Sequence, residues 1–134
     1  MIHRINISTH ARVEFIDMTR KVKDIVADSG VPGGVCHVYV PHTTAAVMIN
    51  EHADPDVVED IAAQLDLIAP QHGKYRHAEG NSPAHIKASL IGDSKAIFIE
   101  DGELALGTWQ GIFFCEFDGP RTRRLMVKIV GDKT

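Results

Sequence analysis

The first thirty-four residues show hydrophobic and polar patterns that predict two extended segments and one helix. Residues 3–8 and 12–16 read as extended. Asp17 then offers a natural helix cap, and apolar side chains recur after it at the i, i+3 and i+4 spacing of one helix face. These side chains are Val22, Ile25 and Val26. Gly30 and the turn at residues 32–34 end the helix, because glycine and proline interrupt helical backbone.

Two strands and a well-marked helix follow. Residues 35–40 are mostly β-branched or aromatic and apolar on both faces, which predicts a strand buried on both sides. Residues 44–50 read as a second strand. Asp54 is a natural N-cap, and Pro55 suits the first helical position. The apolar face of this helix comprises Val57, Val58, Ile61, Ala62 and Leu65.

The C-terminal part reads as one short helix followed by strands and tight turns. The helix is expected over residues 84–90. The strands are expected at residues 95–100, 103–107, 110–117 and 122–130. Asp101-Gly102 joins the first two as a type I′ hairpin signal, and residues 118–121 join the last two. The sequence therefore predicts an α+β class: a single domain over residues 1–134 with an extensive antiparallel β-sheet or sandwich and two to three helices.

Composition narrows the class of protein. Hydrophobic residues make up 44% of the chain and charged residues 24%, which favours a folded core over disorder. A net charge of −4 argues against a nucleic-acid partner. No apolar run approaches the roughly 18 residues of a membrane span, and the N-terminus lacks the apolar segment of a signal peptide, so we expect no membrane partner and a cytoplasmic location. Cys36 and Cys115 lie in apolar runs and are expected to be buried thiols.

Eight histidines raise the question of metal chemistry. His77 and His85 flank a Gly-Asn-Ser-Pro segment at residues 80–83, which turns the backbone sharply. Such a turn can bring two imidazoles together as ligands of one divalent ion, with a third ligand from elsewhere. The spacing is not the i, i+4 pair of an HExxH helix, so it is weak evidence by itself. His42 is a further candidate, because an apolar strand leads directly into it.

Polar side chains also gather where the second strand passes into the following helix. They are Asn50, Glu51, His52 and Asp54. The ends of strands on a rigid scaffold are where binding and catalytic groups are usually built. The plainer interpretation is that Asn50 makes a turn, Asp54 caps the helix and His52 is solvated.

Alternation along residues 110–117 gives that strand two different faces. One face carries Gln110 and Glu116 at the two ends of an apolar strip formed by Ile112 and Phe114. The other face is expected to be core. At ~3.3 Å per residue, Gln110 and Glu116 lie about 20 Å apart, so they cannot touch one small ligand unless another subunit contributes.

Three arginines follow this strand. Arg121 lies in the turn, where its planar fork could bind a phosphate or carboxylate. The alternative for Arg121 is a solvated basic edge, which is also the interpretation we favour for Arg123 and Arg124. The chain contains no phosphate-loop, dinucleotide-binding or serine-hydrolase motif.

Three segments taken together resemble one protein family. "HTTAAVMINEHADPDV", "YRHAEGNSPAHIKASLIG" and "GTWQGIFFCEFDGPRTRR" are similar, in the same order, to motifs of the YjbQ-like family, known as secondary thiamine-phosphate synthase. They span roughly residues 42–124. The resemblance implies an α+β domain assembled as a homotrimer. A trimer would let Gln110 and Glu116 serve different clefts and would cover the apolar strip between them.

The resemblance also implies roles for residues in these motifs. His42, His77 and His85 match a histidine cluster thought to bind a metal ion, and three imidazoles suit zinc better than magnesium, which prefers oxygen ligands. Arg121 and Asn50 would contact substrate or its phosphate. The positions expected to be catalytic are Glu51, Glu79, Gln110 and Glu116.

The implied reaction joins hydroxymethylpyrimidine pyrophosphate to thiazole phosphate, giving thiamine phosphate and pyrophosphate. A divalent cation and an arginine would stabilise the departing group. Magnesium suits this displacement better than zinc does. A three-histidine site that prefers zinc therefore indicates that the reaction is a weak side activity. Two alternatives stay open. One is a metal-dependent hydrolase or lyase that acts on another small phosphorylated metabolite, and the other is a non-catalytic trimer that binds a metal or metabolite.

Overall fold

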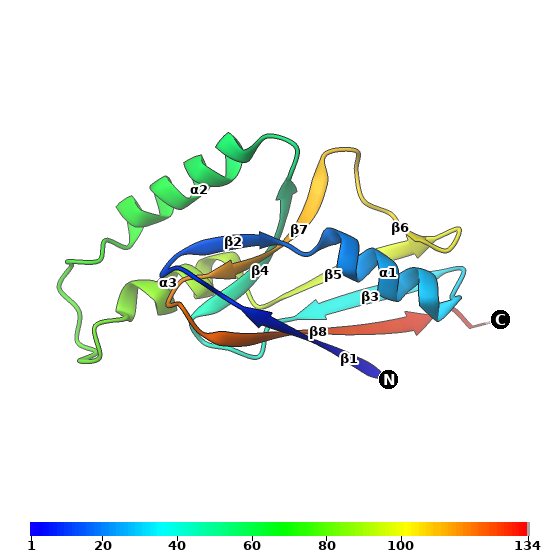
Figure 1. Cartoon of the computed structure of the whole chain (residues 1–134), viewed down its shortest axis with the longest axis horizontal. Helices are drawn as coiled ribbons and strands as arrows, with labels where there is room; N and C mark the ends of the chain where they lie inside the picture. Colours follow the sequence, from blue (N-terminus) through cyan, green and yellow to red (C-terminus); the bar gives the residue numbers. More distant parts are fainter. Residues whose placement is uncertain (134) are drawn as a thin grey trace.

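The computed structural model describes residues 1–133, in which strands and helices follow the predicted order (Figure 1). The strands are β1 (Ile2–Ser8), β2 (Glu14–Asp17), β3 (Gly34–Tyr39), β4 (Ala45–Glu51), β5 (Ser94–Glu100), β6 (Glu103–Leu104), β7 (Gln110–Glu116) and β8 (Thr122–Gly131). The helices are α1 (Thr19–Ser29), α2 (Pro55–Ile68) and α3 (Ser82–Ile91). The largest boundary difference is at β6, which ends at Leu104 where a strand was expected to continue to residue 107.

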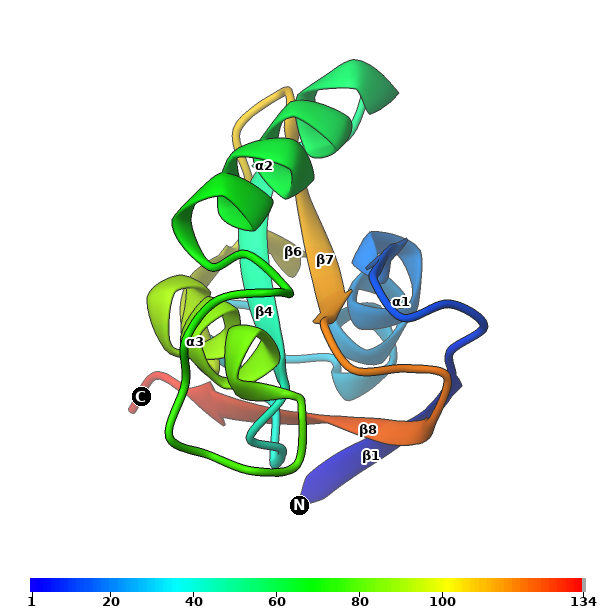
Figure 2. The same ribbon diagram turned by 90° about the vertical axis from the view of Figure 1, so that its left-hand side faces the viewer.

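The strands form two antiparallel sheets. One has the order β1-β8-β3-β5-β6 and the other β2-β7-β4. Figure 2 shows β4 and β7 lying between α1 on one side and α2 with α3 on the other. This layering confirms the predicted α+β class with antiparallel sheets and three helices.

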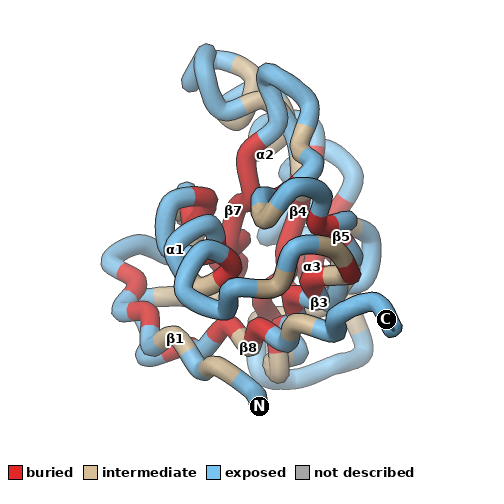
Figure 3. Tube along the Cα trace, turned by 90° about the vertical axis from the view of Figure 1, so that its right-hand side faces the viewer, coloured by how far each residue is buried: buried red, intermediate tan, exposed pale blue. Residues whose placement is uncertain are grey.

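Strand β7 is buried on both faces. In the trace coloured by burial, both β7 and its neighbour β4 run through buried segments (Figure 3). Ile112 and Phe114 belong to one hydrophobic core, while Phe113 and Cys115 belong to a second core under α2 and α3. The expectation that a partner subunit would cover the strip at Ile112 and Phe114 is therefore wrong. Side chains of α1 and of the five-stranded sheet cover it within the same chain.

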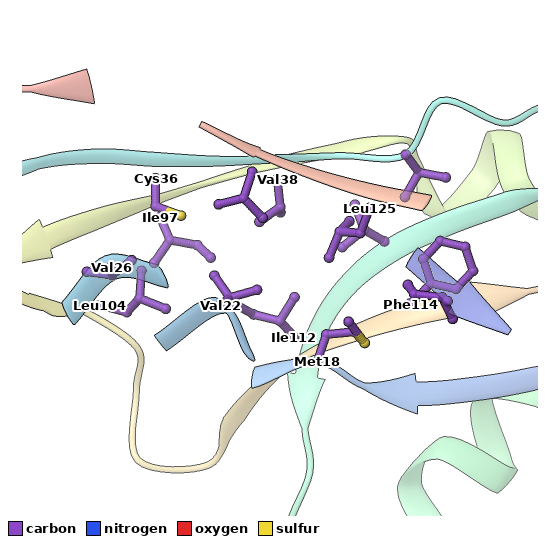
Figure 4. Close-up of a cluster of buried hydrophobic side chains, with 14 of the residues drawn as sticks. Met18, Val22, Val26, Cys36, Val38, Ile97, Leu104, Ile112, Phe114 and Leu125 are labelled. Carbon is purple, nitrogen blue, oxygen red and sulfur yellow. The ribbon is translucent and has the colours of Figure 1, made fainter. Parts of the chain in front are cut away.

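The first core lies between α1 and the inner faces of both sheets (Figure 4). Val22 and Val26 of α1 are buried there, as their helical spacing predicted. Cys36 is buried in this core and Cys115 in the second, which confirms the expectation of buried thiols. Burial raises the pKa of Cys36 to about 11 and that of Cys115 to about 12, so both are protonated near neutral pH.

The predicted turn and cap chemistry positions the helices and hairpin. The Asp54 carboxylate accepts a hydrogen bond from the backbone N–H of Asp56 at 2.9 Å, which caps α2 as expected. Asp17 lies one residue before the cap position of α1 and accepts from the N–H of Thr19 at 2.9 Å. Asp101 and Gly102 both have positive φ, 52° and 79°, as a type I′ hairpin requires.

The outer face of the five-stranded sheet carries an exposed apolar row. Val35 of β3 pairs with Phe98 of β5 and with Val130 of β8, so the three side chains share that face. The exposed fraction is 71% for Phe98 and 48% for Val130. Among the helices in residues 1–133, none is long and apolar enough to cross a membrane.

Candidate functional site

The start of α3 brings two of the candidate histidines together. Asn81 precedes the helix and Pro83 occupies its first turn, so the chain reverses between His77 and His85. The two imidazole rings pack edge to face with their centres 5.3 Å apart. The Glu79 carboxylate lies 3.7 Å from Nε2 of His77. The predicted proximity of His77 and His85 is thus confirmed.

His42 and His85 line the same pocket, from segments that are far apart in the sequence. The pocket has a volume of about 510 Å³ and lies where α3 packs beside β4. Its lining residues are His42, Thr43, Ala45, His85, Ala88, Ser89, Gly92 and Asp93. The three candidate histidines therefore occupy one region: His42 and His85 border the pocket, and His77 packs against His85.

The orientation of His42 is set by β8. Its Nε2 accepts a hydrogen bond from the backbone N–H of Arg124 at 3.0 Å, so in the neutral ring the proton is on Nδ1. Burial lowers the pKa of His42, and the nearby charges of Arg123 and Arg124 lower it further. His42 is therefore neutral at pH 7 and presents an N–H donor at Nδ1.

Two of the three expected imidazole ligands, His77 and His85, are spaced as ligands of one metal ion would be. Two imidazoles bound to one tetrahedral zinc have ring centres about 5 Å apart, given Zn–N bonds of about 2 Å, and the His77–His85 separation fits this. His42 fits less well, because its Nε2 is engaged and its Nδ1 carries the proton. Within residues 1–133, no three His, Cys, Asp or Glu side chains converge in a way that could hold an ion.

Glu116 and Arg123 form an ion pair in the protein interior. Glu116 is fully buried and Arg123 is 5% exposed, and Nη2 of Arg123 lies 2.5 Å from Oε2 of Glu116. The Thr9 hydroxyl donates to Glu116 at 2.7 Å, and Arg123 also donates to the Thr44 hydroxyl at 2.8 Å. The prediction of a solvated Arg123 is wrong, because β8 places it on the inward face with Leu125. These contacts give Glu116 a structural role within the chain.

Arg121 lies beside the start of α3 but already has a partner. Its Nη2 donates to the Asp118 carboxylate at 3.0 Å, and its Nε donates to the Asp118 carbonyl at 2.8 Å. The Asn81 amide donates to the same carboxylate at 3.0 Å, which links Arg121 to the loop that carries His77. Burial alone would raise the pKa of Asp118, but the hydrogen bonds from Asn81 and Arg121 hold it below its ordinary value.

The remaining predicted site residues lie at the opposite end of the three-stranded sheet. Glu51 pairs with Gln110, whereas Ala45 pairs with Glu116 six residues away along β4, which is about 20 Å. Asn50 accepts from the N–H of Glu51 at 2.7 Å, and the Gln110 side chain accepts from the N–H of Gly107 at 2.8 Å. A single chain therefore does not bring these groups to the histidine pocket.

Two side-chain contacts, His52 with Asp17 and Lys87 with Asp66, connect residues that no local sequence pattern links. His52 is exposed, as expected for a solvated side chain, and its Nδ1 also lies 2.9 Å from Oδ2 of Asp17. Lys87 of α3 is 2% exposed and pairs with Asp66 of α2. Helical spacing could have revealed the buried lysine, because Lys87 falls on the same face as the apolar residues Ala84, Ala88 and Ile91.

Comparison with known proteins finds relatives over nearly the whole chain. The profile described as UPF0047 protein YjbQ-like matches residues 3–132. The UPF0047 protein MJ1081 of Methanocaldococcus jannaschii is 50% identical over 99% of this chain and 96% of its own length. The UPF0047 protein YugU of Bacillus subtilis is 48% identical over 98% of this chain and 100% of its own. A crystal structure of a YjbQ/UPF0047-family protein from Clostridium acetobutylicum has a TM-score of 0.94 at 55% identity, covering 96% of this chain and 99% of that one. These names specify a family and no reaction.

Proposed function

Since this chain belongs to the UPF0047 protein YjbQ-like family, we propose that it is an enzyme acting on a small phosphorylated metabolite in the pocket between His42 and His85. The observation that carries this proposal is that histidines from two distant segments line one pocket, with His77 packed beside it. Pockets with a few convergent polar groups are the usual sites of small-molecule chemistry. Following the resemblance, the proposed reaction is a weak thiamine-phosphate synthase activity, and the proposed compartment is the cytoplasm.

The proposed cofactor is a divalent metal ion, with zinc preferred over magnesium. His77 and His85 would supply two nitrogen ligands, and a third protein ligand would have to move toward them, because no three such side chains converge within residues 1–133. When bound, the ion would stabilise the negative charge of a departing pyrophosphate. His42 would act differently, because its Nδ1–H is suited to donate a hydrogen bond to a phosphate oxygen.

Arg121 is the proposed phosphate-binding side chain. It is half exposed and lies next to the loop of His77 through the Asn81–Asp118 contact. A phosphate group would have to displace the Asp118 carboxylate from its guanidinium. That exchange is reasonable for a pair near the surface, because such pairs contribute only about 0–1 kcal/mol.

We also propose the homotrimer that the resemblance implies. Assembly would allow Asn50, Glu51 and Gln110 of one copy to approach the histidine pocket of another. The exposed row containing Phe98 and Val130 supports self-association, because large apolar patches on a surface commonly mark interfaces. Light scattering after size-exclusion chromatography should give the mass of three chains, and Phe98→Glu should reduce it. A monomeric mass for the unaltered chain would refute the trimer.

Metal analysis tests the cofactor. The purified protein should contain close to one zinc ion per chain, and His77→Ala and His85→Ala should each remove most of it. His72→Ala is the matched control, because His72 is an exposed histidine of the same loop. Full metal content in both the His77 and the His85 variants would refute the assigned ligands.

Activity tests the reaction. The protein is incubated with hydroxymethylpyrimidine pyrophosphate and thiazole phosphate, with and without a chelator, and thiamine phosphate is measured by chromatography. Product should form only with metal, and His42→Ala should lower the rate while retaining the metal. Absence of product together with turnover of other phosphate esters would favour the hydrolase or lyase. Absence of all turnover in a metal-loaded trimer would favour the non-catalytic alternative.

A further inference from the structure

A second histidine is held in a fixed orientation away from the His42–His85 pocket. Nδ1 of His52 lies 2.9 Å from Oδ2 of Asp17, and the backbone N–H of His52 donates to the carbonyl of Trp109 at 3.1 Å. A carboxylate only accepts hydrogen bonds, so Nδ1 is the donor and Nε2 is the nitrogen left for a ligand. Gly111 makes room for the ring, because a Cβ there would lie 2.5 Å from the imidazole.

Asp17 is itself fixed by a chain of hydrogen bonds. The backbone N–H of Ile112 donates to the Thr19 hydroxyl at 2.8 Å, and that hydroxyl donates to Oδ1 of Asp17 at 2.5 Å. Burial alone would raise the pKa of Asp17, but its hydrogen bonds from Thr19 and His52 hold it below the ordinary value. The carboxylate therefore stays ionised and keeps the imidazole of His52 oriented.

Two adjoining pockets share Asp17 and His52. The first, of about 310 Å³, has apolar walls from Phe15, Val58 and Phe113. The second, of about 400 Å³, is bordered by Arg20 and Lys23 of α1. An apolar cavity of about 150 Å³ can hold a benzene ring, so the first pocket has room for one ring. Arg20 also contacts Asp24 at 3.4 Å, but both side chains are largely exposed, so this pair would yield readily to an anionic ligand.

We propose that these pockets form a second ligand site, for a small aromatic molecule that carries one phosphate group. The ring would lie against Phe15, Val58 and Phe113, and the phosphate against Arg20, Lys23 and His52. The second pKa of a phosphate monoester is near 6, so part of the ester still carries an O–H at pH 6.5, and this O–H can donate a hydrogen bond to Nε2 of His52. Asp54 and Glu59 also border the ring pocket, which disfavours placing the phosphate there. This site shares no lining residue with the pocket between His42 and His85.

Phenyl phosphate is the probe that tests the proposal, titrated at pH 6.5 into isotope-labelled full-length protein and followed by NMR. Signals of His52 and of Thr19 should shift to saturation with a dissociation constant of about 1 mM. Inorganic phosphate lacks the ring and phenol lacks the charge, so each should bind at least fivefold more weakly. Lys23→Ala should weaken phenyl phosphate binding about fivefold, as expected for an exposed charge pair.

Lys21→Ala provides the matched control, because it removes the same charge from an exposed position of α1 that borders neither pocket. It should leave the affinity unchanged. His52→Gln should weaken binding while its circular dichroism stays that of the parent chain. The proposal is overturned by any of three results: no saturable shift up to about 10 mM, shifts confined to the His42–His85 pocket, or equal weakening by Lys21→Ala and Lys23→Ala. Because the probe, residues and readout differ from those of the metal and activity assays, either site can fail alone.

Discussion

Replacing Glu116 by glutamine should lower the free energy of unfolding by about 3–5 kcal/mol, because the Arg123 guanidinium would remain buried without a counter-charge. Glu116 is fully buried and Arg123 is 5% exposed, so solvent cannot take the place of the lost carboxylate. Glutamine has nearly the same size as glutamate, so no cavity contributes to the loss. The amide would also present N–H groups toward the donors of Arg123 and Thr9, which now both face the carboxylate.

Urea unfolding followed by far-ultraviolet circular dichroism measures this effect. With a slope of about 2 kcal/mol per molar urea, the midpoint should fall by about 1.5–2.5 M. Glu100→Gln is the matched control, because Glu100 is exposed on β5, and its effect should stay within about 0.5 kcal/mol. The double change Glu116→Leu with Arg123→Met should recover most of the loss, because it removes both buried charges. A Glu116→Gln variant within 0.5 kcal/mol of the parent chain would refute the reasoning.

The same ion pair predicts a pH dependence. Burial by itself would raise the pKa of Glu116, but hydrogen bonds from Arg123 and Thr9 outweigh it and lower the pKa in the folded chain. The stabilisation is therefore complete above the unfolded-state pKa of about 4.3 and is lost as the pH falls through the folded-state pKa. Acid unfolding of the Glu116→Gln variant should lack this component. Equal acid sensitivity of both chains would contradict the assignment.

Four further substitutions test other contacts. Gly111→Ala should destabilise the chain by about 1–3 kcal/mol and shift the NMR signals of His52, because the added Cβ would lie 2.5 Å from its ring; an unperturbed His52 would contradict this. Asp66→Ala should lower the free energy of unfolding in urea by about 2–4 kcal/mol, because it leaves the buried Lys87 amino group without a counter-charge. Lys87→Met should leave the free energy of unfolding nearly unchanged, because it removes the buried charge and Asp66 is 56% exposed. The reverse ranking of the two variants would refute the interpretation. Asp54→Ala should cost about 1 kcal/mol through the lost α2 cap, and an unchanged melting profile would argue against that cap.

Local pattern was sufficient to predict most of the secondary structure. Asp54-Pro55 identifies the start of α2, and Asp101-Gly102 identifies the β5–β6 hairpin, because each signal depends on backbone geometry within a few residues. The burial of Arg123 can also be predicted from the sequence, since alternation along β8 places it on the same face as Leu125. Arginines near strand ends are usually exposed, so the sequence favours a solvated Arg123. Only the fold shows that Arg123 pairs with the buried Glu116.

The candidate sites depended on contacts that no local pattern encodes. The turn between His77 and His85 was predictable because its glycine and proline lie in the same loop. The approach of His42 to His85 depends on α3 packing beside β4, and His52 meets Asp17 across 35 positions of sequence. Such pairings follow from sheet order, which the chain's periodicity does not specify.

The arrangement of two cores on either side of β7 implies that the chain does not open as one unit. Helix α2 buries a single residue, Leu65, whereas six of the seven residues of β7 are buried. Amide hydrogens of α2 should therefore exchange with solvent through local opening, long before those of β7 exchange through global unfolding. The Lys87–Asp66 pair ties α3 to this less protected helix. Local opening of α2 would therefore break one of the contacts that hold α3, the helix that carries His85.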